Sequence, residues 1–260
     1  MEIGVVATPA DAALLKEAGF DYIELNIQQA FAPTNPSDEI ESALITAKES
    51  PLGFPAACVL LPGGMKVVGP EVDAVAVKQC IETVCKRAAL VGSEVIVFGS
   101  GAGRAVPEGF DRNEARMQLL AFARMAADVA EGYGITIVLE PLQHIETNIF
   151  NSLDESGDFV AEVDHPHFRL LVDAFHWAKV GDTPEMIVKH ADKLHHAHLA
   201  TYANRKTPGV EDCDFGPFLK ALKQGGYNRR VTVEARFDNL VDEAKAAAPI
   251  LRKALAEAGF

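Results

Sequence analysis

Four short apolar segments in the second half of the chain each end in, or close to, a side chain that can bind a metal ion. These are Glu140 at the end of 135–140, Asp173 at the end of 169–173, His198 near the end of 194–199, and Glu234 near the end of 231–235. If the segments are neighbouring strands, three carboxylates and one imidazole converge on one point. Like charges held that closely cost several kcal/mol, and a divalent cation removes this cost.

One of these segments contains three histidines, His195, His196 and His198. Successive side chains of a strand point to opposite faces, so His196 and His198 share one face and His195 takes the other. The ligand should lie at the C-terminal end of the strand. We therefore predict His198 as the ligand, His196 as its neighbour one layer below, and His195 as facing the surrounding helices. Carboxylates with one imidazole suit Mn²⁺ best, with Mg²⁺, Co²⁺ and Zn²⁺ as alternatives.

The elements that would position these residues alternate along the whole chain. Eight short segments, most of them continuously apolar, are predicted as strands: 3–7, 22–27, 56–60, 94–98, 135–140, 169–173, 194–199 and 231–235. The stretches between them are predicted to be helical, the longest at 70–91, 112–133 and 242–258. Strands separated by helices form parallel βαβ units of about 30 residues each. The sequence thus predicts an α/β fold, a (β/α)8 TIM barrel with one domain over 1–260, and an active site at the C-terminal strand ends. A doubly wound open sheet is the structural alternative.

The composition of the chain argues against some classes of binding partner. The formal net charge is −13, which argues against nucleic acid and against anionic membrane surfaces. Four cysteines occur without a CxxC pair, as expected of reduced thiols. The N-terminal segment lacks the pattern of a secretory signal, and no apolar run is long enough to span a bilayer. We therefore expect a cytoplasmic protein whose partner is a small molecule.

Several motifs between Glu140 and Glu234 resemble those of the sugar phosphate isomerase/epimerase family of xylose-isomerase-like barrels. This family includes ketose 3-epimerases, hydroxypyruvate isomerases and inosose-processing enzymes. The motifs are Glu140-Pro141, Asp173-Ala174-Phe175-His176, His198-Leu199-Ala200, the run 204–209 (NRKTPG) and Val233-Glu234.

The resemblance implies roles for seven residues. It implies that Glu140, Asp173, His198 and Glu234 bind the metal, and that Glu146, His176 and Arg205 contact the sugar. Two features depart from the pattern of the ketose 3-epimerases. Arg205 falls one residue later after His198 than in those enzymes, and the early loops lack an aromatic wall, since the only tryptophan is Trp177. Family members are commonly dimers or tetramers, so the resemblance is compatible with a homo-oligomer.

These residues favour a divalent-metal-dependent sugar isomerase or epimerase. The metal would polarise a sugar carbonyl, and Glu140 and Glu234 would remove and return a proton through an enediolate. A metal-dependent dehydratase or lyase acting on an inosose-like polyol ketone is the alternative, because it would need the same ligands. A nuclease on this barrel would need more histidines at the rim and a basic groove, which this acidic chain does not offer.

Two further charged residues have no assigned place in this scheme. Arg104 ends the glycine-rich run 99–104 and could reach an anionic group of a substrate. Glu24 lies inside the apolar segment 22–27, and its direction cannot be determined from the pattern. It is either a buried partner of Arg104 or a surface residue.

Overall fold

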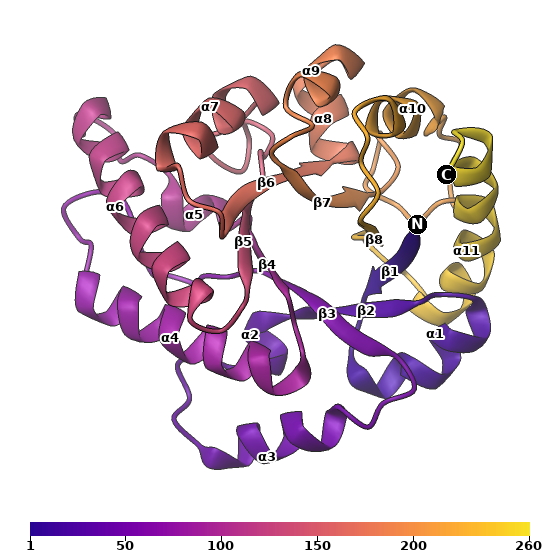
Figure 1. The fold of residues 1–260 in the computed structure, drawn as a ribbon, viewed down its shortest axis with the longest axis horizontal. Coiled ribbons are helices and arrows are strands. Elements are labelled where there is room, and N and C mark those ends of the chain that lie inside the picture. Colours follow the sequence, from indigo (N-terminus) through magenta and orange to yellow (C-terminus); the bar gives the residue numbers. More distant parts are fainter.

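Eight parallel strands form a closed barrel in the computed structural model, which describes residues 1–260. The strands are β1 Glu2–Val6, β2 Tyr22–Asn26, β3 Gly53–Cys58, β4 Val95–Phe98, β5 Thr136–Leu139, β6 Phe168–Asp173, β7 Leu194–Leu199 and β8 Arg230–Val233. Each strand pairs with the next, and β8 pairs with β1 through Gly4 and Thr232, which closes the sheet. The predicted (β/α)8 TIM barrel is confirmed, and the open sheet is excluded (Figure 1).

Helices surround the barrel on its outside (Figure 1). They are a 3-10 turn Pro9–Asp11, α1 Ala12–Ala18, α2 Ile27–Ala30, α3 Asp38–Ala47, α4 Ala74–Val91, α5 Gly101–Arg104, α6 Arg112–Glu131, α7 Leu153–Val163, α8 Ala174–Val180, α9 Pro184–Lys189, α10 Gly216–Gln224 and α11 Leu240–Glu257. The three long predicted helices correspond to α4, α6 and α11. Asp73 and Asp111 start α4 and α6, because each carboxylate accepts two backbone N–H groups of the first turn. No helix is long and apolar enough to cross a membrane.

The strands separate two apolar cores. Side chains on the outer face pack against the helices in one cluster of 65 buried residues. A second cluster of six contains alternate residues of four neighbouring strands and no helical residue, so it faces the barrel axis: Ala56, Cys58, Val95, Val97, Val138 and Leu171. This half of the barrel interior is therefore apolar.

The other half of the interior is polar. Glu24 of β2, His196 and His198 of β7, and Thr232 of β8 are fully buried there. Tyr22 lies beside Gly4 of β1, where an added Cβ would come within 2.2 Å of the tyrosine ring. A glycine is needed at this position for Tyr22 to fit inside the barrel. The polar half of the interior leads up to the ends of β7 and β8, where two of the predicted ligands lie.

Candidate metal centre

The four predicted ligands lie at the C-terminal ends of β5 to β8. Asp173 is the last residue of β6 and pairs in register with His198 of β7. Glu140 and Glu234 each come one residue after their strands, where their backbone N–H groups still donate to Phe98 and Leu199. The parallel ladder thus extends to both glutamates and fixes where their side chains start.

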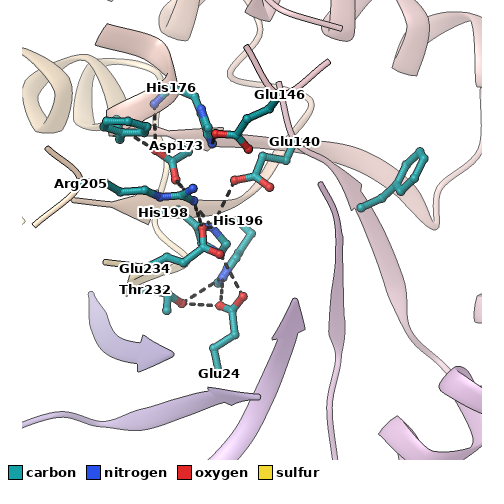
Figure 2. Close-up of polar contacts among 12 residues, drawn as sticks. Glu24, Glu140, Glu146, Asp173, His176, His196, His198, Arg205, Thr232 and Glu234 are labelled. Carbon is teal, nitrogen blue, oxygen red and sulfur yellow. Dashed lines mark hydrogen bonds and ion pairs between the residues drawn. The ribbon is translucent and has the colours of Figure 1, made fainter. Parts of the chain in front are cut away.

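The four side chains face one another. Nδ1 of His198 lies 3.0 Å from Glu234 Oε2, 3.5 Å from Glu140 Oε1 and 3.9 Å from Asp173 Oδ2. One ligand atom from each residue lies within 4.8 Å of the other three. Figure 2 shows the three carboxylates around the imidazole. The structure therefore brings together the complete predicted set.

The chemistry of this set fits a divalent cation. Glu140 Oε1 and Asp173 Oδ2 are buried without a hydrogen-bond partner, although such oxygens normally have one. The other oxygen of Asp173 is occupied, because Oδ1 accepts the N–H groups of Phe175 and His176 at the start of α8. Two unpaired carboxylate oxygens beside an imidazole nitrogen match the ligands of Mn²⁺, Mg²⁺ or Co²⁺.

The electrostatics of the cluster point the same way. Burial raises the pKa of Glu140, and the nearby charge of Glu234 raises it further, while His198 opposes this. Burial also disfavours ionised Glu234, but Arg205 and His198 outweigh it and hold the pKa of Glu234 below its usual range. The protein's own positive charges therefore stabilise the ionised form of Glu234 better than that of Glu140. A divalent cation at the site would supply the missing positive charge beside Glu140.

Two of the predicted substrate contacts, His176 and Glu146, lie beside the cluster. His176 is 1% exposed, and its Nδ1 accepts the backbone N–H of Gln143 at 3.2 Å. Its Nε2 therefore carries the proton, has no hydrogen-bond partner, and lies 4.0 Å from Glu146 Oε1. Gln143 also donates from Nε2 to Glu146 at 2.8 Å, so one residue holds both side chains.

The third predicted contact, Arg205, lies on the other side of the cluster. Its guanidinium contacts Glu234, lies 3.6 Å from Asp173 Oδ2, and stacks 5.4 Å from the centroid of Phe175. Arg205 has a φ of +56°, a left-handed conformation that costs energy in a residue with a side chain. Backbone hydrogen bonds to Thr201 and from Arg236 hold it there. The later position of this arginine in the sequence therefore does not keep it from the site.

Arg104 does not reach the mouth of the barrel. The glycine-rich run forms the short helix α5, and Arg104 points from it into the core with no exposed surface. Its guanidinium donates to the carbonyl groups of Phe98 and Glu140, at 3.0 and 2.6 Å. Arg104 therefore does not reach an anionic group of a substrate, the option that the sequence left open, because these carbonyl groups already occupy its guanidinium.

Glu24 was the charged residue whose direction the sequence left open. It points into the barrel, where its carboxylate contacts His196 and His198 rather than Arg104 (Figure 2). His196 lies one layer below His198, as predicted, and His195 lies on the opposite face beside Arg229. A single charged residue within an otherwise apolar strand was the signal for Glu24. Its direction required the partner strands.

Comparisons with known proteins identify the family. The profile of the family described as xylose isomerase-like TIM barrels matches residues 12–256, and the chain belongs to this family. An L-ribulose 3-epimerase of Methylomonas sp. is 32% identical over 160 residues, which span 59% of this chain and 54% of that enzyme. The 3-dehydro-D-guloside 4-epimerase of Escherichia coli is 26% identical over 85% of this chain and 84% of its own length.

The fold of a solved ketose epimerase is also similar. D-psicose 3-epimerase from Clostridium cellulolyticum, solved with D-tagatose, superposes with a TM-score of 0.83 over 98% of this chain and 99% of that one, at 22% identity. At this identity the likeness concerns the fold. Both of the relatives described above are sugar epimerases, which is consistent with an enzyme of the isomerase class.

Proposed function

We propose that this chain is a divalent-metal-dependent epimerase or isomerase that moves a proton beside the carbonyl of a small ketose or keto sugar. The observation that carries the proposal is the position of Glu140 and Glu234 at the two ends of the ligand set, after β5 and β8. Two carboxylates that approach one substrate from different strands can act on opposite faces of a carbon atom.

Glu140, Asp173, His198 and Glu234 would hold the cation. When bound, the cation would act as a Lewis acid on the carbonyl and the neighbouring hydroxyl group, and so increase the acidity of the adjacent C–H bond. Mn²⁺ is our first choice of metal, since the set is rich in oxygen.

The side chains would then carry the proton. One of the two glutamates removes the proton next to the carbonyl, and the C–H electron pair moves into an enediolate-type anion. Return of a proton by the second glutamate to the opposite face gives an epimer, and return to the neighbouring carbon gives an isomer. The Nε2–H group of His176 has no partner in the protein and would donate to the oxygen that gains charge.

Arg205 and Glu146 would orient the sugar. Arg205 lies 16% exposed at the edge of the cluster and can donate to a substrate oxygen as well as to Glu234. Glu146 is 34% exposed, and its carboxylate can accept a sugar hydroxyl while Gln143 holds it. Together they would place the reacting carbon between the two glutamates.

The cations near the mouth favour a sugar without a phosphate group. Arg104 is buried against backbone carbonyls, and Arg205 is paired with Glu234. The amine of Lys66 donates to the carbonyl of Ala102 at 2.8 Å. Of these three groups only Arg205 keeps a donor for a substrate oxygen, whereas a bound phosphate needs several free donors.

Hydrogen exchange with the solvent tests the proposal on many sugars in parallel. The Mn²⁺-loaded protein is incubated in D₂O with a panel of free ketoses, keto sugar acids and inososes, and NMR follows deuterium at the carbon beside the carbonyl. We expect exchange with at least one neutral sugar, together with an epimer or isomer. An enone or dicarbonyl absorbance would instead indicate the dehydratase alternative. No exchange across the whole panel would count against proton abstraction.

A further inference from the structure

A sealed polar cluster lies directly below the ligand set, on the side of the histidines away from Glu140 and Asp173 (Figure 2). Its centre is Glu24 of β2, and its other members are His196 of β7 and Thr232 of β8. All three are 0% exposed. A carboxylate buried this deeply persists only if its oxygens are fully hydrogen-bonded, so the cluster requires an explanation.

Both oxygens of Glu24 are occupied. Oε1 lies 3.0 Å from Nε2 of His198. Oε2 lies 2.8 Å from Nε2 of His196 and accepts the hydroxyl of Thr232 at 2.6 Å. That hydroxyl is also 2.7 Å from the hydroxyl of Tyr22. The carboxylate is thus fixed from three sides and meets the ligand His198 through one oxygen.

This contact determines how His198 meets a metal. An ionised carboxylate can only accept hydrogen bonds, so Nε2 of His198 carries the proton. In the absence of a metal, Nδ1 lies 3.0 Å from ionised Glu234 and donates a second proton to it. A cation that replaces this proton meets the lone pair of the neutral ring on Nδ1, which faces the three ligand carboxylates. A carboxylate behind a ligating histidine also makes the ring a stronger donor and fixes its orientation.

We propose that Glu24 is a positioning residue of the metal centre, which holds His198 in the Nε2–H tautomer with Nδ1 directed at the cation. His196 and Thr232 act on Glu24 rather than on the metal. The inference rests on the proposed function only in requiring that a divalent cation binds at Glu140, Asp173, His198 and Glu234.

Glu24, His196 and His198 could in principle hold a second cation, since their ligand atoms also lie close together. The contacts argue against it. Each imidazole Nε2 already meets a Glu24 oxygen at hydrogen-bond length, and Thr232 donates to the same carboxylate. The group offers only three ligands, and protons fill the positions a metal would take. We therefore expect one metal ion per chain.

A graded set of variants tests the proposal by titration of metal-free protein with Mn²⁺ in a calorimeter. Glu24→Gln keeps the size of the side chain but removes its charge, and should weaken Mn²⁺ binding by about 10- to 100-fold. Thr232→Val removes one of the donors to Glu24 and should cost a few-fold. Tyr22→Phe is the matched control: it breaks only the outer contact to Thr232 and should bind like the wild type. Thermal unfolding of the metal-free variants checks that each one folds.

Two further readouts separate positioning from a general structural role. In ¹⁵N NMR of the Zn²⁺-loaded protein, the His198 ring should show a proton on Nε2 in the wild type and lose that defined signature in Glu24→Gln. The rate at which Glu24→Gln exchanges the substrate proton beside the carbonyl for solvent deuterium should recover towards the wild-type rate at saturating Mn²⁺.

Several outcomes would overturn the inference. A folded Glu24→Gln that binds Mn²⁺ as tightly as the wild type would overturn it and leave the proposed function intact. Two metal ions per chain, with one lost in Glu24→Gln, would show that Glu24 is itself a ligand. If Glu24→Gln does not fold, Thr232→Val tests the inference instead. We expect a few-fold weaker Mn²⁺ binding in this variant, and wild-type binding would overturn the inference. A wild-type protein that binds no Mn²⁺ would overturn both this inference and the proposed function.

Discussion

Gln143 donates its backbone N–H to Nδ1 of His176 across 3.2 Å, and this contact decides which nitrogen of His176 faces the candidate site. Because Nδ1 is an acceptor, the proton is on Nε2, which is buried and has no partner in the protein. A buried donor that is left free at the edge of a ligand set is available to a substrate oxygen.

Substitution of His176 should reveal this donor. In His176→Gln the amide nitrogen can occupy the place of Nε2, whereas in His176→Asn it lies near the place of Nδ1 and this donor is lost from the site. We expect kcat to fall by about 10²–10³-fold in His176→Asn, as for other lost oxyanion donors, and by less in His176→Gln. Steady-state kinetics on a substrate found by exchange would measure this. Equal losses in the two variants would contradict a role for the Nε2 proton.

The two glutamates should have separable roles. Glu140→Gln and Glu234→Gln each keep an oxygen ligand but remove a proton acceptor, so kcat measured at saturating Mn²⁺ should fall by about 10²–10⁴-fold in each. Each variant should still exchange the proton of the one epimer that its remaining glutamate can reach. Deuterium exchange from both purified epimers measures the difference. Near-normal turnover in either variant would contradict the two-carboxylate scheme.

The sequence was sufficient to predict the barrel and the four side chains that meet at its mouth, for a physical reason. Buried parallel strands are continuously apolar, so a carboxylate at the end of such a strand is conspicuous, and the βαβ repeat places all strand ends on one side. Alternation along β7 then separated His198 and His196 from His195, as the structure has them.

The residues whose place the sequence left open depend on contacts made after the barrel closes. Glu24 is conspicuous within β2, but only pairing with the neighbouring strands shows that it faces His198. Arg104 follows β4 in a stretch without a regular apolar pattern. There Gly101–Arg104 forms a helical turn, and this turn directs the Arg104 side chain into the core. A loop residue's direction is not fixed by periodicity, and so its role could not be derived from the pattern alone.

Gly99, at the end of β4, leaves room for Glu140. A Cβ at Gly99 would come within 2.3 Å of Glu140 Oε2, so Gly99→Ala should displace this carboxylate from the ligand set. A displacement of about 1 Å can cost about 10²-fold in rate, and we expect a loss of that order together with weaker Mn²⁺ binding. Gly63→Ala is the control in a nearby loop, because its Cβ would meet no atom within 4 Å. Wild-type kinetics in Gly99→Ala would show that Glu140 can move without consequence.

Removal of the metal should lower stability. Glu140 and Asp173 are buried and each has one carboxylate oxygen without a partner, so a cation bound only by the folded state stabilises it by mass action. At 100 times the dissociation constant, Mn²⁺ should add about 2.7 kcal/mol to the free energy of unfolding. Thermal unfolding with Mn²⁺ and with EDTA measures the effect. The same shift in Asp173→Asn would place the stabilising ion elsewhere on the protein.

His195, on the outer face of β7, should make stability depend on pH independently of the metal. Burial lowers the pKa of His195 from its ordinary value of 6.5 to about 4, and the charge of Arg229 contributes. Between these values the unfolded chain binds a proton that the folded protein does not. The free energy of unfolding therefore falls as the pH drops from about 6.5 to 4, and is unaffected by His195 above that range.

Substitution of His195 by glutamine removes this proton uptake. Because the ring is only partly buried, we expect the wild type to lose about 1–2 kcal/mol more than His195→Gln between pH 6.5 and 4. Urea unfolding of the two metal-free proteins at several pH values gives the difference, in which the titration of all shared groups cancels. Parallel curves would mean that His195 titrates alike in both states. A steeper loss in the variant would mean that the histidine is stabilised in its charged form.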